Sequence, residues 1–191
     1  MILKELYLYP DLVDFDDGIT RAFRDQSRSM CNYLERQLKS IRFDAVGFKR
    51  ICFVGKSDPS SECSINSSNV LIVEVRFDEE EYRTLEKDQL NTFFLEMIRS
   101  GIKKCQEQHR VPANDLLERL EEFRAGGFSN RWTFKTITLK ELGVKCALEC
   151  NLTVDAFQLN LVLYREGVGL LSREILMTEP DEIVFAPQFK E

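Results

Sequence analysis

The chain has 191 residues, of which 43% are hydrophobic and 30% are charged, and its formal net charge is −6. These values are ordinary for a globular protein, and we predict a single domain spanning residues 1–191. A sequence pI near 5.1 argues against direct nucleic-acid binding, which usually takes a basic face. No stretch reaches the roughly 18 apolar residues of a membrane span, and residues 2–9 lack the apolar core of an export signal. We therefore expect a cytoplasmic protein without membrane contact.

The first third of the chain predicts strands around one long helix. Residues 3–9 predict a strand, and residues 17–41 repeat apolar side chains at the spacing of a helix. Residues 48–55 and 69–77 are rich in strand-forming side chains. The second of these is apolar at nearly every position, which favours a central strand covered on both faces. The polar loop between them, residues 56–68, is longer than a hairpin needs, so we expect it to be mobile or functional.

Four consecutive acids, Asp78 to Glu81, mark the start of a second helical block over residues 78–108. Asp78 stands where an N-cap belongs and Glu81 follows three residues later, as in a capping box. Successive side chains are turned by about 100° around a helix, so these acids cannot converge on one metal ion. Pro112 ends this block, and a third helix follows over residues 113–124.

The last third changes to the period of two that is typical of strands. In residues 144–153 and 156–164 the apolar side chains alternate, and the short connection between them suits a hairpin. Residues 131–140 predict a further strand, and residues 170–178 and 182–187 predict edge strands. We therefore predict an α+β fold, with a largely antiparallel sheet of six to eight strands and about three helices packed on one face.

Few side chains indicate catalysis. His109 is the only histidine, and its place at the end of the second helical block favours a helix-end residue over a catalytic base. The common motifs of hydrolases and nucleotide-binding proteins are absent. Asp14, Asp16 and Asp17 could form part of a metal-dependent site, but helix capping explains them more simply. We expect no catalytic residues, no metal and no cofactor.

The six cysteines indicate neither a disulfide framework nor a zinc site. The closest pair, Cys146 and Cys150, would lie about 13 Å apart along one strand, too far for a disulfide or a shared metal ion. We expect reduced thiols that pack as small apolar side chains. The sequence does not decide whether Cys63, in the polar loop, is reactive.

Charge is distributed unevenly along the chain. Between Thr20 and Lys56 nine basic residues stand against three acids, which a solvated surface explains better than phosphate binding. Acids concentrate elsewhere, and acidic patches can occupy the cationic groove of a basic partner. The candidate partner contacts are acids of the third helix and of the C-terminal segment, with the 56–68 loop as a further candidate. They are Glu118, Glu121, Glu122, Asp181 and Glu182.

Three stretches within residues 2–55 carry a resemblance: ILKELYLYPDLVDF, RDQSRSMCNYLERQL and FKRICFVG. They resemble the immunity proteins of bacterial polymorphic toxin systems, such as contact-dependent inhibition. The resemblance implies a small cytosolic protein, not an enzyme, that binds one cognate toxin domain and masks its active site, often through acidic residues. The implied partner is a protein toxin with a basic surface. No family motif assigns a role to an individual residue here.

Two other functions fit the same sequence. An adaptor or chaperone-like interaction module predicts a contiguous exposed apolar patch instead of an acidic one. A small carboxylate-based enzyme requires the acids at 14–17, or His109, to converge in a pocket with perturbed pKa values. The sequence does not predict an oligomeric state.

Overall fold

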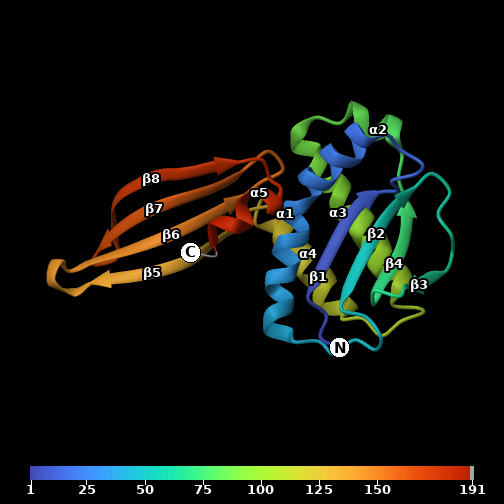
Figure 1. Cartoon of the computed structure of the whole chain (residues 1–191), viewed down its shortest axis with the longest axis horizontal. Coiled ribbons are helices and arrows are strands. Elements are labelled where there is room, and N and C mark those ends of the chain that lie inside the picture. The colour runs from blue at the N-terminus through green and yellow to red at the C-terminus, as the bar shows by residue number, and fades with distance from the viewer. Residues whose placement is uncertain (190–191) are drawn as a thin grey trace. The chain divides into compact units, whose positions relative to one another are not determined.

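The computed structural model describes residues 1–189, and the chain falls into two compact units, Met1–Phe128 and Ser129–Glu191, each described here by itself (Figure 1). The elements of the N-terminal unit are β1 (Glu5–Pro10), α1 (Asp17–Ile41), β2 (Arg50–Lys56), β3 (Cys63–Ile65), β4 (Val70–Arg76), α2 (Glu79–Thr84), α3 (Lys87–Cys105) and α4 (Ala113–Ala125). Those of the C-terminal unit are β5 (Arg131–Leu139), η1 (Lys140–Leu142), β6 (Val144–Leu152), β7 (Phe157–Arg165), β8 (Val168–Thr178), α5 (Glu182–Phe185) and η2 (Ala186–Phe189). The single domain expected over residues 1–191 stays a prediction.

The fold is α+β, but the expected single sheet of six to eight largely antiparallel strands is wrong. The described strands form two sheets of four, in the orders β1-β2-β4-β3 and β5-β6-β7-β8. In the first sheet β1, β2 and β4 are parallel, and β3 is antiparallel to β4. The helix α1 connects β1 to β2, and such a crossover returns the chain to the same end of the sheet. Near-continuous burial along β2 is typical of parallel strands, which a search for alternation does not reveal.

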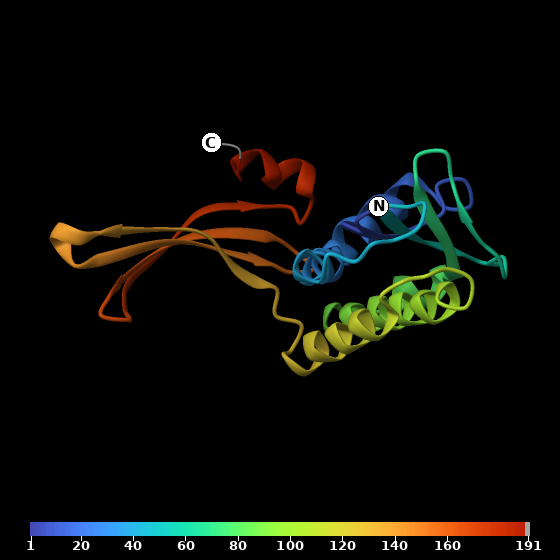
Figure 2. The ribbon, with the colours of Figure 1, turned by 90° about the horizontal axis from the view of Figure 1, so that it is seen from below.

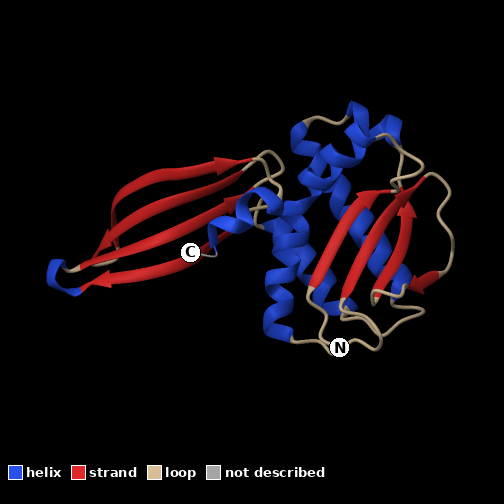
Figure 3. Ribbon diagram, viewed as in Figure 1, coloured by secondary structure: helices blue, strands red, loops and turns tan. Residues whose placement is uncertain are grey.

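Helices cover one face of the N-terminal sheet. In Figure 3, α3 and α4 lie behind the strands, and Figure 2 shows both on the same side of them. Leu6, Ile51 and Leu71 are neighbours in register across β1, β2 and β4, and all three are fully buried. The close approach of α3 depends on Gly101, because a Cβ atom there would lie 2.3 Å from Cδ1 of Phe53.

The helices begin where their caps predict. The carboxylates of Asp16 and Asp78 accept backbone hydrogen bonds at the starts of α1 and α2. The predicted block over residues 78–108 is two helices and not one, because the backbone is extended at Leu85 and Glu86 before α3 begins. Within residues 1–189, no helix is both long and apolar enough to cross a membrane.

Side chains of α1 close the outer edge of β1. The carboxylate of Glu35 accepts a hydrogen bond from the backbone N–H of Leu6 at 2.8 Å, and the guanidinium of Arg28 donates to the carbonyl of Leu6 at 2.9 Å. Arg28 and Glu35 are buried and also form an ion pair with each other. Ser27 donates to the carbonyl of Leu8 at 2.8 Å. These side chains take the place of a neighbouring strand, so this part of β1 presents no free edge.

The other face of this sheet is covered by none of the helices of the N-terminal unit. Cys52 and Val54 are buried there among partly buried side chains that include Tyr7 and Tyr9. The guanidinium of Arg50 lies 4.8 Å from the centre of the Tyr7 ring. Long side chains of the strands therefore shield this face in place of a helix.

The C-terminal unit is an antiparallel meander in which β5 and β8 form the two edges. The pairing register shifts once in β5 and twice in β8. The residues without a partner at these shifts are Phe134, Leu170 and Ile175. Each shift inserts an extra residue as a β-bulge does, which bends the edge strand and interrupts its row of hydrogen bonds.

Residues 182–187 were expected to form an edge strand, and this prediction is wrong. They belong to α5 and η2, and α5 begins at Asp181, whose carboxylate accepts a hydrogen bond from the N–H of Ile183 at 2.9 Å. Phe185 and Phe189 are four residues apart and pack against the same ring of the sheet. Phe189, the second residue of this pair, lies beyond residues 182–187, on which the strand was predicted, so the helical spacing was not visible there.

We predict that Glu35→Ala lowers the free energy of unfolding of the N-terminal unit by about 3–5 kcal/mol, because it removes a carboxylate paired with the buried guanidinium of Arg28. The same change removes the acceptor of the Leu6 N–H. Urea unfolding followed by the helical circular dichroism signal measures the loss. The matched control is Glu96→Ala, which breaks an exposed pair with Arg99 and should cost no more than about 1 kcal/mol. Equal losses in the two variants would contradict the role given to Glu35.

Candidate functional site

The two faces of the C-terminal sheet differ in chemistry, because successive side chains of a strand point to opposite sides. One face, the polar face, carries amides, hydroxyls and charged groups in rows across the strands. Its members include Arg131, Asn151 and Gln158 in one row, Thr133, Glu149 and Asn160 in the next, and Thr138, Lys145 and Tyr164 further out. The other, the apolar face, carries aromatic, leucine and isoleucine side chains.

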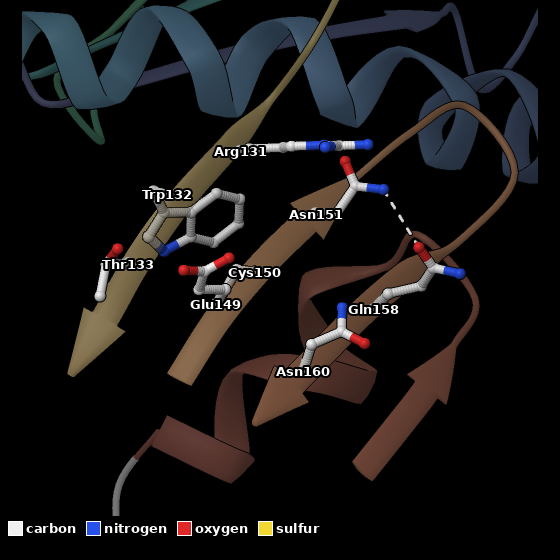
Figure 4. A pocket seen from close by; sticks show the side chains of 8 residues that line it. All are labelled: Arg131, Trp132, Thr133, Glu149, Cys150, Asn151, Gln158 and Asn160. Carbon is white, nitrogen blue, oxygen red and sulfur yellow. Dashed lines mark hydrogen bonds between the residues drawn. The ribbon is translucent and has the colours of Figure 1, made fainter. Parts of the chain in front are cut away.

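A groove runs along the polar face. One part is a cavity of about 390 Å³ (Figure 4), and it continues into a second of about 530 Å³ that shares Thr133 and Glu149 with the first. Across β6 and β7, the amide of Asn151 donates to Oε1 of Gln158 at 3.1 Å. Tyr164 donates from its hydroxyl to Oε1 of Glu149 at 2.5 Å. The hydrogen bond to this carboxylate raises the pKa of Tyr164.

The groove presents hydrogen-bonding groups on short side chains. Figure 4 shows three amides, one guanidinium and one threonine hydroxyl around the first cavity. The carboxylate of Glu149 is engaged by Tyr164, and no histidine lines either cavity. Among residues 1–189, no three histidine, cysteine, aspartate or glutamate side chains gather closely enough to hold a metal ion. The groove is therefore polar and lined by hydrogen-bonding groups.

The inner half of the apolar face is covered by the C-terminal helices. Phe157 lies at the centre of this core. Phe185 stacks on its ring with a centroid distance of 4.1 Å, and Phe189 meets it edge-on at 5.7 Å. Trp132, the only tryptophan of the chain, packs against the same cluster. The cluster is completed by the strand residues Cys150, Leu152 and Leu159.

The outer half of the apolar face is uncovered, and we call it the open half. Ile137 and Leu139 of β5 are 52% and 43% exposed, and Leu171 of β8 is 51% exposed. Between them, Cys146 and Leu163 are partly buried and share one row with Ile137 and Leu171. Contiguous exposed apolar side chains of this kind are typical of an interaction surface.

The acids predicted as partner contacts on the third helix differ in their environment. Glu118 is exposed on α4. Glu121 pairs with Arg99 of α3 and with Arg124 of α4. Glu122 pairs with Arg119 at 2.5 Å. Two of the three carboxylates are therefore balanced by arginines of the same unit, which weakens the negative field they present to a partner.

The other two predicted acids, Asp181 and Glu182, belong to the C-terminal unit. Asp181 is the N-cap of α5, and Glu182 lies in its first turn. Both side chains therefore stabilise the helix that covers the inner half of the apolar face. Whether the five acids contact a partner stays a prediction.

The acids near the start of α1 have structural roles. Asp16 caps the helix, and Asp17 lies in its first turn. Asp14 lies 3.3 Å from the ammonium of Lys56. His109 follows α3, packs edge-on against Phe48 with a centroid distance of 6.3 Å, and lines none of the cavities described above. The structure does not bring these acids and this histidine together.

The polar loop over residues 56–68 is attached to the end of α3. The side chain of Gln108 accepts a hydrogen bond from the N–H of Cys63 at 2.8 Å and donates to the carbonyl of Ser61 at 2.9 Å. Lys104 donates to the carbonyl of Ser60. Burial raises the pKa of the Cys63 thiol, which lowers its thiolate fraction at neutral pH. All six cysteines are free thiols.

Sequence reasoning recognised the alternation of β6 and β7 but missed the open half as a site. Its exposed members lie on β5 and β8, and their position beside Cys146 and Leu163 depends on the strand register. The available signal was a pair of outer strands that carry apolar residues at alternate positions. The polar face gave a weaker signal, the regular threonines of residues 133–138.

Comparison with known proteins adds no assignment. No family model matches the chain, and neither a curated protein nor a solved structure is significantly similar to it.

We predict that Phe185→Ala lowers the free energy of unfolding of the C-terminal unit by about 3–5 kcal/mol, because the core of this unit loses a ring stacked on Phe157. Trp132 lies in that core, so its fluorescence during urea unfolding reports on this unit. Ile183→Ala is the matched control on the same helix, since Ile183 is 77% exposed, and it should change the stability by less than about 0.5 kcal/mol. An unchanged fluorescence transition in Phe185→Ala would show that α5 is not part of this core.

Proposed function

We propose that this protein is a non-catalytic protein-interaction module, of the adaptor or chaperone-like kind, that binds a polypeptide partner through the open half of its C-terminal sheet. The observation that carries the proposal is the exposure of Ile137 and Leu139 on β5 and of Leu171 on β8, on one sheet face whose middle is formed by the half-buried Cys146 and Leu163. An apolar patch of this kind is the feature that separates an interaction module from a protein that acts through an acidic surface.

Two further observations support the proposal. The bulges at Phe134, Leu170 and Ile175 interrupt both outer strands, so the edges are poorly suited to strand addition and the face is the better docking surface. The residues considered for an enzymatic site are used elsewhere: the acids near α1 in capping and ion pairing, and His109 in packing against Phe48.

A pair of photo-crosslinking variants tests this proposal. Leu139 and Thr138 are neighbours on β5 that point to opposite faces, and each is replaced by a benzophenone-bearing residue. In cells that naturally carry the gene, we expect one reproducible crosslinked protein from position 139 and none from position 138. The captured protein, once identified and purified, should bind the full chain, and Leu171→Asp should weaken that binding at least about tenfold.

Two results would contradict the proposal. One is equal crosslinking from positions 138 and 139. The other is an identified partner whose affinity is unchanged by Leu171→Asp, provided that the Trp132 fluorescence of this variant shows a folded C-terminal unit.

A second candidate function is neutralisation of a cognate bacterial toxin domain by masking its active site. It is supported by the resemblance of residues 2–55 to immunity proteins of polymorphic toxin systems and by the exposure of Glu118 on α4. In this function the exposed carboxylates would attract a basic toxin surface. A toxin bound through the open half would satisfy both candidates.

Co-purification with the product of the adjacent upstream gene tests the toxin hypothesis. We expect a complex that survives moderate salt, and Glu118→Lys should slow its association because a rim charge acts mainly on the association rate. Glu107→Lys, which reverses an exposed acid outside the predicted set, is the matched control and should have a smaller effect. An upstream gene without a toxin-like domain, together with no complex, would remove this candidate.

A further inference from the structure

We infer that the occupant of the open half is an amphipathic helix of another protein, with acidic side chains on both flanks of its apolar stripe. The inference deepens the proposed function and rests on it, because it names the partner for the same surface. It is argued from the charges around the open half, from its dimensions and from the helix already seated beside it.

The charged strand residues on the apolar face are all cations. Lys135 of β5 and Arg173 of β8 share a row with Leu148 and Leu161, and both lie on the apolar face. Arg165 continues the alternation of β7 to the outer end of the same face. No strand residue on this face is an aspartate or glutamate. Within the described part of the chain, none of the three cations forms an ion pair, so a partner's carboxylates would meet them unopposed.

The dimensions of the open half suit a short helix. From Lys135 to Leu139 the face extends about 14 Å along the strands, and four strands span about 14 Å across. A helix of three turns is about 16 Å long and presents one apolar stripe with polar side chains on both flanks. Because Lys135 and Arg173 lie on opposite outer strands, the stripe would cover the leucines while each flank reaches one cation.

The inner half of the same face shows which kind of element packs here. Phe185 and Phe189 of α5 and η2 rest on Phe157, so the layer against this face is helical already. A helix on the open half would continue that layer. A second copy of this chain is a poorer occupant, because pairing two open halves brings Lys135, Arg165 and Arg173 of one copy towards those of the other with no carboxylate between them.

The probe for the test is a fluorescein-labelled peptide of about 14 residues that forms a helix with one leucine stripe and glutamates on both flanks. The matched control peptide carries lysine at each glutamate position. Fluorescence anisotropy measures the affinity of both peptides for the full chain. We expect the acidic peptide to bind at least about tenfold more tightly, with a difference that shrinks as salt is added.

Three variants locate the binding. Lys135→Glu combined with Arg173→Glu should invert the preference, so that the basic peptide binds more tightly. Leu171→Asp should weaken both peptides, whereas Thr136→Asp, which places a charge on the opposite face of the same sheet, should leave both affinities unchanged. Trp132 fluorescence checks that each variant keeps the C-terminal unit folded.

The possible results show whether the helical acidic partner, the proposed function, or both are wrong. A basic peptide that binds as well as the acidic one, with both lost in Leu171→Asp, overturns the charge assignment and leaves an apolar docking face. Binding of neither peptide, together with no effect of Leu171→Asp on the crosslinked partner, overturns both. A dimer in analytical ultracentrifugation that Leu171→Asp abolishes shows a self-interface and overturns the helical partner.

Discussion

The C-terminal unit has one apolar sheet face, and within this unit residues 182–189 are the described segment that packs on it. Phe185 and Phe189 bury the inner half by packing on Phe157. The strands nevertheless continue beyond the reach of this helix, and they keep their apolar alternation as far as Leu139 and Leu171. Solvent-facing positions of a strand are usually polar, unlike these. The retained apolar side chains are consistent with the proposed docking of a partner on the open half.

The N-terminal unit meets the same requirements with its own residues. Its helices bury one face of the sheet, and the Arg28–Glu35 pair satisfies the backbone of Leu6 at the outer edge of β1. Even its helix-free face is shielded by long side chains such as Arg50 over Tyr7. The N-terminal unit exposes apolar side chains as well, among them Leu12, Val13 and Val46, but these lie in turns and bends, whereas those of the open half lie in register on one sheet face.

Local sequence signals predicted where helices and strands lie better than they predicted which strands pair and which side chains meet. Helix α1 has the predicted bounds, and the caps Asp16 and Asp78 stand where expected, because capping depends only on neighbouring residues. The division of eight strands into two sheets depends on contacts distant in sequence, so one sheet was expected instead. The five predicted partner acids stay a prediction, but their surroundings could not be predicted for the same reason. Acids are visible one by one, whereas the neutralisation of Glu121 by Arg99 and the row from Ile137 to Leu171 exist only after folding.

The sheet edges fit the proposal that a partner docks on the face. Exposed outer strands with apolar side chains invite pairing with other strands, and bulges are one of the devices that prevent it. Both edges of this sheet carry such bulges, at Phe134 in β5 and at Leu170 and Ile175 in β8. Edge pairing would use backbone groups and would accept almost any strand, whereas a face bordered by Lys135, Arg165 and Arg173 selects by side-chain chemistry. Bulged edges beside an uncovered open half thus disfavour general aggregation through the edges and fit the proposed docking on the face.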